Sequence, residues 1–252
     1  MSWILDLYRS PMAKKVVMAV TGLMLFGFVL AHMVGNLKIY QGAEKLDAYA
    51  VGLRELGAPV LGYGEALWLM RGGLVAAVVL HILSAYQLTM VNRRARASAY
   101  KKTRHRESTY ASRTMRWGGV IIVLFVVYHL LHFTTGHAHP EFEHGKVFNN
   151  VVLGFQNPLS ASFYILANLA LGLHLFHGLW SMFQTLGWNG PRFNPARKAF
   201  AVAFALLIAG INISFPVAVL AGVVKPEAAT VALEAPADEH AATATGQQTS
   251  DH

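Results

Sequence analysis

The chain has 252 residues, of which 54% are hydrophobic and 13% charged, and its formal net charge is +8. Soluble domains carry about 25% charged residues, so this composition excludes an ordinary soluble domain and indicates a membrane protein. The chain has no cysteine, which excludes iron–sulfur clusters, thiolate-bound haem and disulfide bonds within it.

Five apolar runs predict an all-α integral membrane protein with five transmembrane helices. We expect these spans at residues 16–37, 66–91, 118–135, 159–186 and 199–224. The first run has the length of a full span and lacks a small-residue cleavage site, so we expect a retained helix rather than a signal peptide.

Two further segments complete the predicted organisation. Residues 42–57 place apolar side chains on one helical face and charges on the other, which is typical of a helix on the membrane surface. From Lys225 the chain becomes rich in alanine, threonine and glutamate. We therefore expect a membrane domain over 1–224 and a disordered tail over 225–252.

Positive charge is distributed unevenly over the connections. The connection 92–117 holds nine lysines and arginines, whereas the third connection and the tail hold one each. Cytoplasmic loops collect positive charge, so we expect a cytoplasmic N-terminus and a C-terminus outside. Topology and contact with anionic lipid explain this basic loop, and docking of a soluble subunit is the alternative. The concentration of positive charge in particular connections between spans argues against a nucleic-acid partner.

Each of the first four spans contains histidine. His32 and His81 lie in the first two spans, the third span has His129 and His132, and the fourth has His174 and His177. Histidine inside a span is rare and usually functional, and neutral imidazole is a common ligand of haem iron. One such histidine alone is more often a hydrogen-bonding partner between helices. Four spans with histidine match what two bis-histidine haems need.

Span direction predicts which histidines meet. Spans one and three run outward, so His32 and His129 or His132 form an outer pair, whereas His81 and His174 or His177 form an inner pair. Depths counted at about 1.5 Å per residue match within each pair but do not choose within the two His-x-x-His motifs. The count leans to the second histidine of each motif.

Several motifs in order carry a resemblance to a known family. They are Ala31-His-Met-Val-Gly-Asn36, Arg71 with His81, Tyr110-Ala-Ser-Arg-Thr-Met-Arg116, Tyr128-His-Leu-Leu-His-Phe133 and His174-Leu-Phe-His-Gly-Leu-Trp-Ser181. Over residues 1–224 the chain resembles the five-helix, di-haem cytochrome b subunits of succinate dehydrogenases and fumarate reductases (the cytochrome b558 family).

The resemblance implies the site residues. The first four helices would form a di-haem bundle in which His32 and His129 bind the outer haem b, and His81 and His174 bind the inner haem b. His132, His177 and Arg71 become candidates for supporting positions near the haems. In the family's menaquinone-linked members an acidic group lies near the outer haem, and Glu65 is the nearest candidate for such a quinone site. An ordinary surface glutamate at a span end is the alternative.

The resemblance also implies a function in the membrane of a bacterium. A flavoprotein subunit and an iron–sulfur subunit would dock on the cytoplasmic side of the inner membrane, and this chain would pass electrons from succinate to a quinone, menaquinone by expectation. The reaction can also run as quinol:fumarate reduction. The chain itself is expected to have no dehydrogenase site.

Three other functions remain open at this point. The first is a di-haem cytochrome b subunit of another quinone-linked enzyme, such as a hydrogenase or formate dehydrogenase. The second is a transporter with a histidine proton relay, although no inverted repeat is visible. The third is a haem-free anchor for soluble subunits.

Overall fold

Five long helices form most of the structure. The computed structural model describes residues 10–94, 110–188 and 190–227, and within them all regular structure is helical. The long helices are α2 (Pro11–Asn36), α4 (Glu65–Arg94), α5 (Tyr110–Phe133), α7 (Pro158–Thr185) and α8 (Asn194–Leu220). All five contain a stretch long and apolar enough to cross a membrane. The five predicted spans are thus confirmed, and the chain is a multi-pass membrane protein.

Local sequence sets where these helices begin. The Ser10 hydroxyl accepts a hydrogen bond from the Ala13 N–H at 3.1 Å, and Pro11 follows at the first helical position. The Asn157 side chain accepts from Leu159 N–H at 2.9 Å, ahead of α7. Both are N-caps that satisfy backbone donors which the helix itself leaves unpaired.

Short helices gather at one end of the bundle. They are the 3₁₀ helix η1 (Leu37–Gln41), α3 (Ala43–Gly52) and α6 (Val147–Gln156). Asp47 of α3 accepts a hydrogen bond from the Phe148 N–H at the start of α6, at 2.9 Å. A core of buried apolar residues joins η1, α3 and α6 to the end of α8. We call this the α3/α6 end; the helix predicted within 42–57 is part of it.

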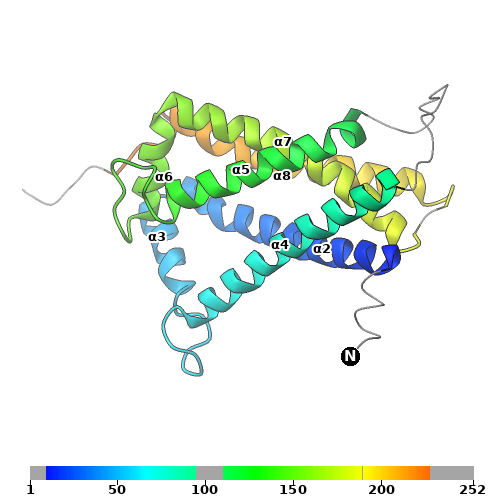
Figure 1. Cartoon of the computed structure of the whole chain (residues 1–252). Coiled ribbons are helices and arrows are strands. Elements are labelled where there is room, and N and C mark those ends of the chain that lie inside the picture. Colours follow the sequence, from blue (N-terminus) through cyan, green and yellow to red (C-terminus); the bar gives the residue numbers. More distant parts are fainter. Residues whose placement is uncertain (1–9, 95–109, 189, 228–252) are drawn as a thin grey trace, which may run out of the picture.

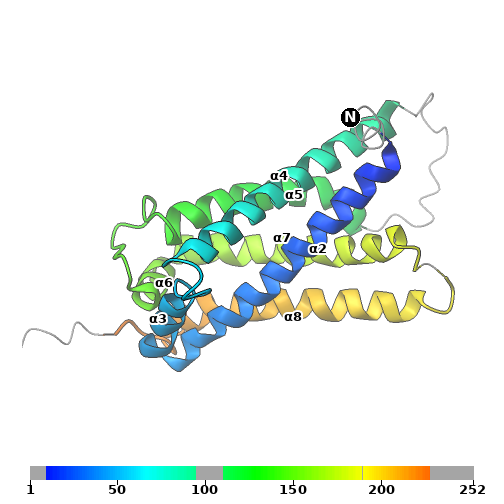
Figure 2. The same ribbon diagram turned by 90° about the horizontal axis from the view of Figure 1, so that it is seen from below.

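The long helices associate mainly in pairs. α2 packs along α4, α5 along α7, and α8 packs chiefly on α7. The helices alternate in direction, so the N-terminal end of α2 lies opposite the α3/α6 end (Figures 1 and 2). We call this opposite end the basic end, after its exposed residues Lys15, Arg93, Arg94, Arg116 and Lys198. Most of the predicted basic loop, and the predicted disordered tail from residue 228 on, lie outside the described residues.

Candidate functional site

The inner pair of histidines brings together two helices from different packed pairs. His81 of α4 and His174 of α7 have ring centroids 6.3 Å apart, with planes inclined by 63°. Within the described residues, α4 and α7 share no extensive packing interface. The two rings therefore approach one another edge to face although their helices share no extensive interface.

The hydrogen bonds of His81 assign the position of its ring proton. Its Nδ1 lies 3.2 Å from the Met18 carbonyl oxygen and 3.3 Å from the Thr21 hydroxyl. That hydroxyl donates to the Val17 carbonyl oxygen at 2.7 Å, so both neighbours of Nδ1 act as acceptors. Nδ1 therefore carries the proton, and the lone pair of the neutral ring lies at Nε2.

Glycine at position 22 lets His81 lie close against α2, because a Cβ there would come within 3.3 Å of the His81 ring. A Cβ at Gly119 of α5 would make only ordinary van der Waals contact with the His174 ring, at 3.9 Å. Gly172 has another purpose, because a Cβ there would meet Ala209 of α8 at 3.0 Å. The Nδ1 of His174 is buried with no hydrogen-bond partner within the described part of the chain, which is uncommon for a buried polar atom.

The outer pair joins the other two helices. His32 of α2 and His129 of α5 have ring centroids 5.8 Å apart, with planes inclined by 87°. Phe28 stacks on His32 at 5.3 Å. The Nδ1 of His129 lies 3.3 Å from the hydroxyl of Tyr164 on α7. The structure thus brings together the same two pairs of spans that the sequence predicts.

The two pairs lie at different levels of the bundle. The inner pair lies against Gly22 on α2 and Gly119 on α5. His32 and His129 each lie ten residues further along those helices, which corresponds to roughly 15 Å. The outer pair is therefore nearer the α3/α6 end and the inner pair nearer the basic end.

The donor set and its geometry fit haem. An iron atom about 2 Å from a nitrogen of each of two imidazoles separates the ring centroids by roughly 6 Å. The observed separations are 5.8 Å and 6.3 Å. In the described residues no group of three or more histidine, aspartate or glutamate side chains is placed to hold a metal ion. A site with two imidazoles suits a metal whose other ligands come from a macrocycle such as haem. Ligation by these four histidines stays a prediction.

The second histidine of each His-x-x-His motif is placed differently. His132 is 2% exposed and stacks on His139 with ring centroids 5.0 Å apart. Its Nδ1 lies 3.2 Å from the Tyr164 hydroxyl. His177 is half-buried on α7, one turn closer to the basic end than His174. The ring beside His32 is that of His129, and the ring beside His81 is that of His174, as the resemblance implies. The depth count favoured the second histidine of each motif, and neither of those rings pairs with His32 or His81 in this way.

Arg71 and Glu65 lie near the α3/α6 end of α4. The Arg71 guanidinium lies over the Trp68 ring, 4.8 Å from its centroid. Glu65 is the exposed first residue of α4, and its carboxylate accepts a hydrogen bond from the Gly62 N–H at 3.0 Å. This contact gives Glu65 a local role at the start of α4, and its predicted role at a quinone site stays a prediction.

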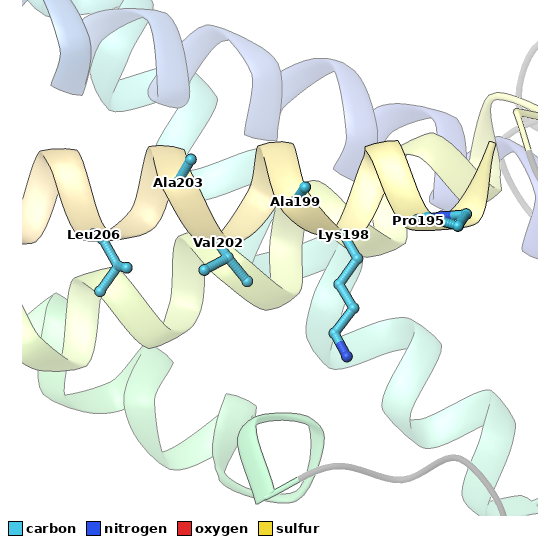
Figure 3. Close-up of a pocket in the computed structure, with 6 residues that line it drawn as sticks. All are labelled: Pro195, Lys198, Ala199, Val202, Ala203 and Leu206. Atoms are coloured by element: carbon cyan, nitrogen blue, oxygen red, sulfur yellow. The ribbon is translucent and has the colours of Figure 1, made fainter.

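An exposed strip lies along the N-terminal half of α8. Its residues are Pro195, Lys198, Ala199, Val202, Ala203 and Leu206. Figure 3 shows Lys198, Val202 and Leu206 projecting on the same side of the helix. An apolar strip with a lysine at its basic end suits a lipid-facing surface with its amine at headgroup level.

Sequence reasoning missed the groups that orient the rings. Tyr164 and Thr21 lie within apolar spans, where a lone aromatic or hydroxyl residue is typical of helix packing. The third group, the Met18 carbonyl, belongs to the backbone and leaves no trace in the sequence. Tyr164 precedes His174 by ten residues, a spacing that places Tyr164 at the level of the outer pair, His32 and His129. This spacing is the feature of the sequence that could have pointed to Tyr164.

Comparison with protein families identifies the chain. A family model described as the succinate dehydrogenase/fumarate reductase transmembrane subunit matches residues 90–213. The matched stretch includes α5, α6, α7 and most of α8, and therefore both His129 and His174. No curated protein and no solved structure matched the chain. The order of five spans, the histidines in α5 and α7 and the family match agree, and the chain belongs to the family of transmembrane subunits of succinate dehydrogenase and fumarate reductase.

Proposed function

We propose that this chain is a di-haem cytochrome b subunit that transfers electrons between an iron–sulfur subunit and a membrane quinone, with menaquinone as the expected quinone. The observation that carries the proposal is the pair of facing imidazoles at each of two levels, with centroids 5.8 Å and 6.3 Å apart. Bound haem b would supply one-electron redox chemistry at each level.

The chain's own residues would hold and orient these groups. His32 with His129 would hold one haem, and His81 with His174 would hold the other. The Met18 carbonyl and the Thr21 hydroxyl keep the proton of His81 on Nδ1, which leaves Nε2 to bind iron. Such contacts fix ring orientation and raise the basicity of a ligating imidazole.

The proposed complex follows from the charge of the two ends. We infer that the basic end faces the cytoplasm of a bacterial inner membrane and docks the soluble subunits, because positive charge collects on that side. The C-terminal end of the chain then lies outside. Succinate oxidation would occur in the flavoprotein subunit, and the same arrangement supports quinol:fumarate reduction. Family membership favours this complex over a hydrogenase or formate dehydrogenase.

The deciding test is the haem content of the purified chain. We expect a pyridine haemochrome assay to return two haem b per chain, and reduced-minus-oxidised spectra to show low-spin, six-coordinate haem. One haem per chain would overturn the assignment of one pair. No haem would leave a haem-free membrane anchor as the function.

A further inference from the structure

The phenol of Tyr164 connects the two histidines of the His-x-x-His motif in α5. Its oxygen lies 3.3 Å from Nδ1 of His129 and 3.2 Å from Nδ1 of His132. Tyr164 is 4% exposed and His132 is 2% exposed. Water therefore has little access to replace either contact, and the three groups must satisfy one another.

Donor counting gives these contacts a direction. If Nε2 of His129 binds iron, its Nδ1 carries the ring proton and donates to the Tyr164 oxygen. A phenol has a single proton, which must then be donated to Nδ1 of His132. His132 accordingly acts as an acceptor and carries its own proton on Nε2. The result is a directed chain from His129 through Tyr164 to His132.

His132, the last group in this hydrogen-bond chain, is held by residues of the α3/α6 end. His132 stacks on His139 at an interplanar angle of 26°. His139 donates from Nε2 to the Asn150 carbonyl oxygen at 2.8 Å, and its Nδ1 accepts from the Glu141 N–H at 3.2 Å. His139 thus uses both ring nitrogens within the protein, and its fixed ring supports the orientation of His132.

We propose that Tyr164 is the positioning residue of the outer haem site, accepting a hydrogen bond from His129 and donating one to His132, and that it thereby lowers the outer haem's reduction potential. The inference rests on the proposed function. An acceptor at Nδ1 makes the ligating imidazole more basic, and a more basic ligand favours ferric over ferrous iron. His132 strengthens the effect, because a phenol that donates its proton becomes a better acceptor.

Tyr164→Phe isolates the hydrogen bond from packing. The ring of Tyr164 packs against those of Phe125, Phe133 and Phe155, with centroids 5.1, 5.3 and 5.0 Å away. Phenylalanine keeps this ring and removes only the oxygen. Tyr128→Phe is the matched control, because Tyr128 lies in the same cluster but its hydroxyl contacts Ser160, 3.1 Å away.

The experiment is a potentiometric titration that follows the haem absorbance. His32→Ala and His81→Ala variants first assign the outer and inner steps. In Tyr164→Phe we expect the outer potential to rise, with both haems retained and the inner potential unchanged. His132→Leu should raise the outer potential by a smaller amount, and His132→Asn, which restores an acceptor oxygen, should reverse most of that rise. Tyr128→Phe should change neither potential.

The outcomes separate this inference from the proposed function. Absence of haem from the unaltered chain overturns both. Two bound haems with an outer potential that is unchanged or lower in Tyr164→Phe overturn the inference alone. An equal shift in Tyr128→Phe also overturns it, because packing rather than the hydrogen bond would then set the potential.

Discussion

At the scale of single residues, His81 and His139 differ in how their ring nitrogens are used. At His81 the two acceptors beside Nδ1 leave the Nε2 lone pair for a metal. At His139, Nε2 donates to a carbonyl and Nδ1 accepts from a backbone N–H. His139 is buried and His81 is half-buried, yet of the two only His81 has a ring nitrogen without a hydrogen-bond partner among the described residues. Burial alone therefore does not mark a haem ligand.

The proposed haem ligands and the other buried histidines should respond differently to single substitutions. We expect His32→Ala and His129→Ala each to remove the outer haem, and His81→Ala and His174→Ala each to remove the inner haem. His132→Ala should retain both haems, with a changed outer potential. The measurement is haem per chain together with the spectrum of the remaining haem. Loss of a haem from His132→Ala would reverse the assignment within that motif.

The sequence predicts the histidine pairs but not what orients them. Histidines are rare enough in apolar helices that alternating span direction was sufficient to pair His32 with the third span and His81 with the fourth. The contacts of Tyr164 and Thr21 depend on how far each helix rotates about its axis, and helix rotation is decided by packing across the whole bundle. For the same reason the choice between His129 and His132 required the family resemblance.

At the scale of elements, the α3/α6 end depends on a contact that spans much of the sequence. Asp47 of α3 satisfies the Phe148 N–H at the start of α6. α6 in turn packs against the end of α5, since a Cβ at Gly154 would lie 2.9 Å from the His132 ring. A carboxylate at a helix N-terminus also interacts favourably with the helix dipole. α3 thus supports the environment of the outer pair through α6.

Loss of this cap should destabilise the α3/α6 end. We expect Asp47→Ala to lower the free energy of unfolding by about 1 kcal/mol, the usual value of a side-chain N-cap. Asp47→Asn keeps an acceptor oxygen and should retain most of that stability. Thermal unfolding of the purified protein in detergent measures both. Equal midpoints for Asp47→Ala and the unaltered chain would mean that this hydrogen bond contributes nothing.

Helix ends were harder to predict than helices. The third span was expected to start at residue 118, but α5 begins at Tyr110. Hydropathy detects only the part of a helix inside lipid, whereas the helical hydrogen bonds of α5 continue through polar residues beyond it. Similarly, the amphipathic pattern over 42–57 indicated a helix, and α3 within it ends at Gly52.

At the scale of the whole molecule, charge is asymmetric along the bundle axis. Among the described residues, the exposed side chains of Lys15, Arg93, Arg94, Arg116 and Lys198 mark one end. The α3/α6 end mixes signs, as the ion pair of Lys45 with Glu44 at 3.1 Å illustrates. Arg197, also at the basic end, is buried against Trp180 and donates to the Trp188 carbonyl oxygen at 3.0 Å. It holds the α7–α8 connection and contributes little to the exposed charge.

The exposed charge of the basic end should steer the soluble subunits to the side nearer the inner pair. Reversing Arg93 and Arg94 to glutamate changes the local charge at the end of α4 without touching any histidine. We expect the iron–sulfur and flavoprotein subunits to co-purify less with this double variant, mainly through slower association, because exposed interface charges act chiefly on encounter rates. The matched control reverses Lys45 and Lys146, which are exposed at the α3/α6 end.

Association rates measured over a range of salt concentrations test this prediction more stringently. The Debye length falls from about 30 Å at 0.01 M salt to about 8 Å at 0.15 M. The difference in association rate between the Arg93/Arg94 variant and the unaltered chain should therefore be largest at low salt and shrink as salt rises, with both haems retained throughout. The Lys45/Lys146 control should associate at the unaltered rate at every salt concentration. Equal effects of the two double variants would show that the partner responds to net charge and not to this end. A loss of haem from the Arg93/Arg94 variant would instead assign these arginines to the folding of the bundle.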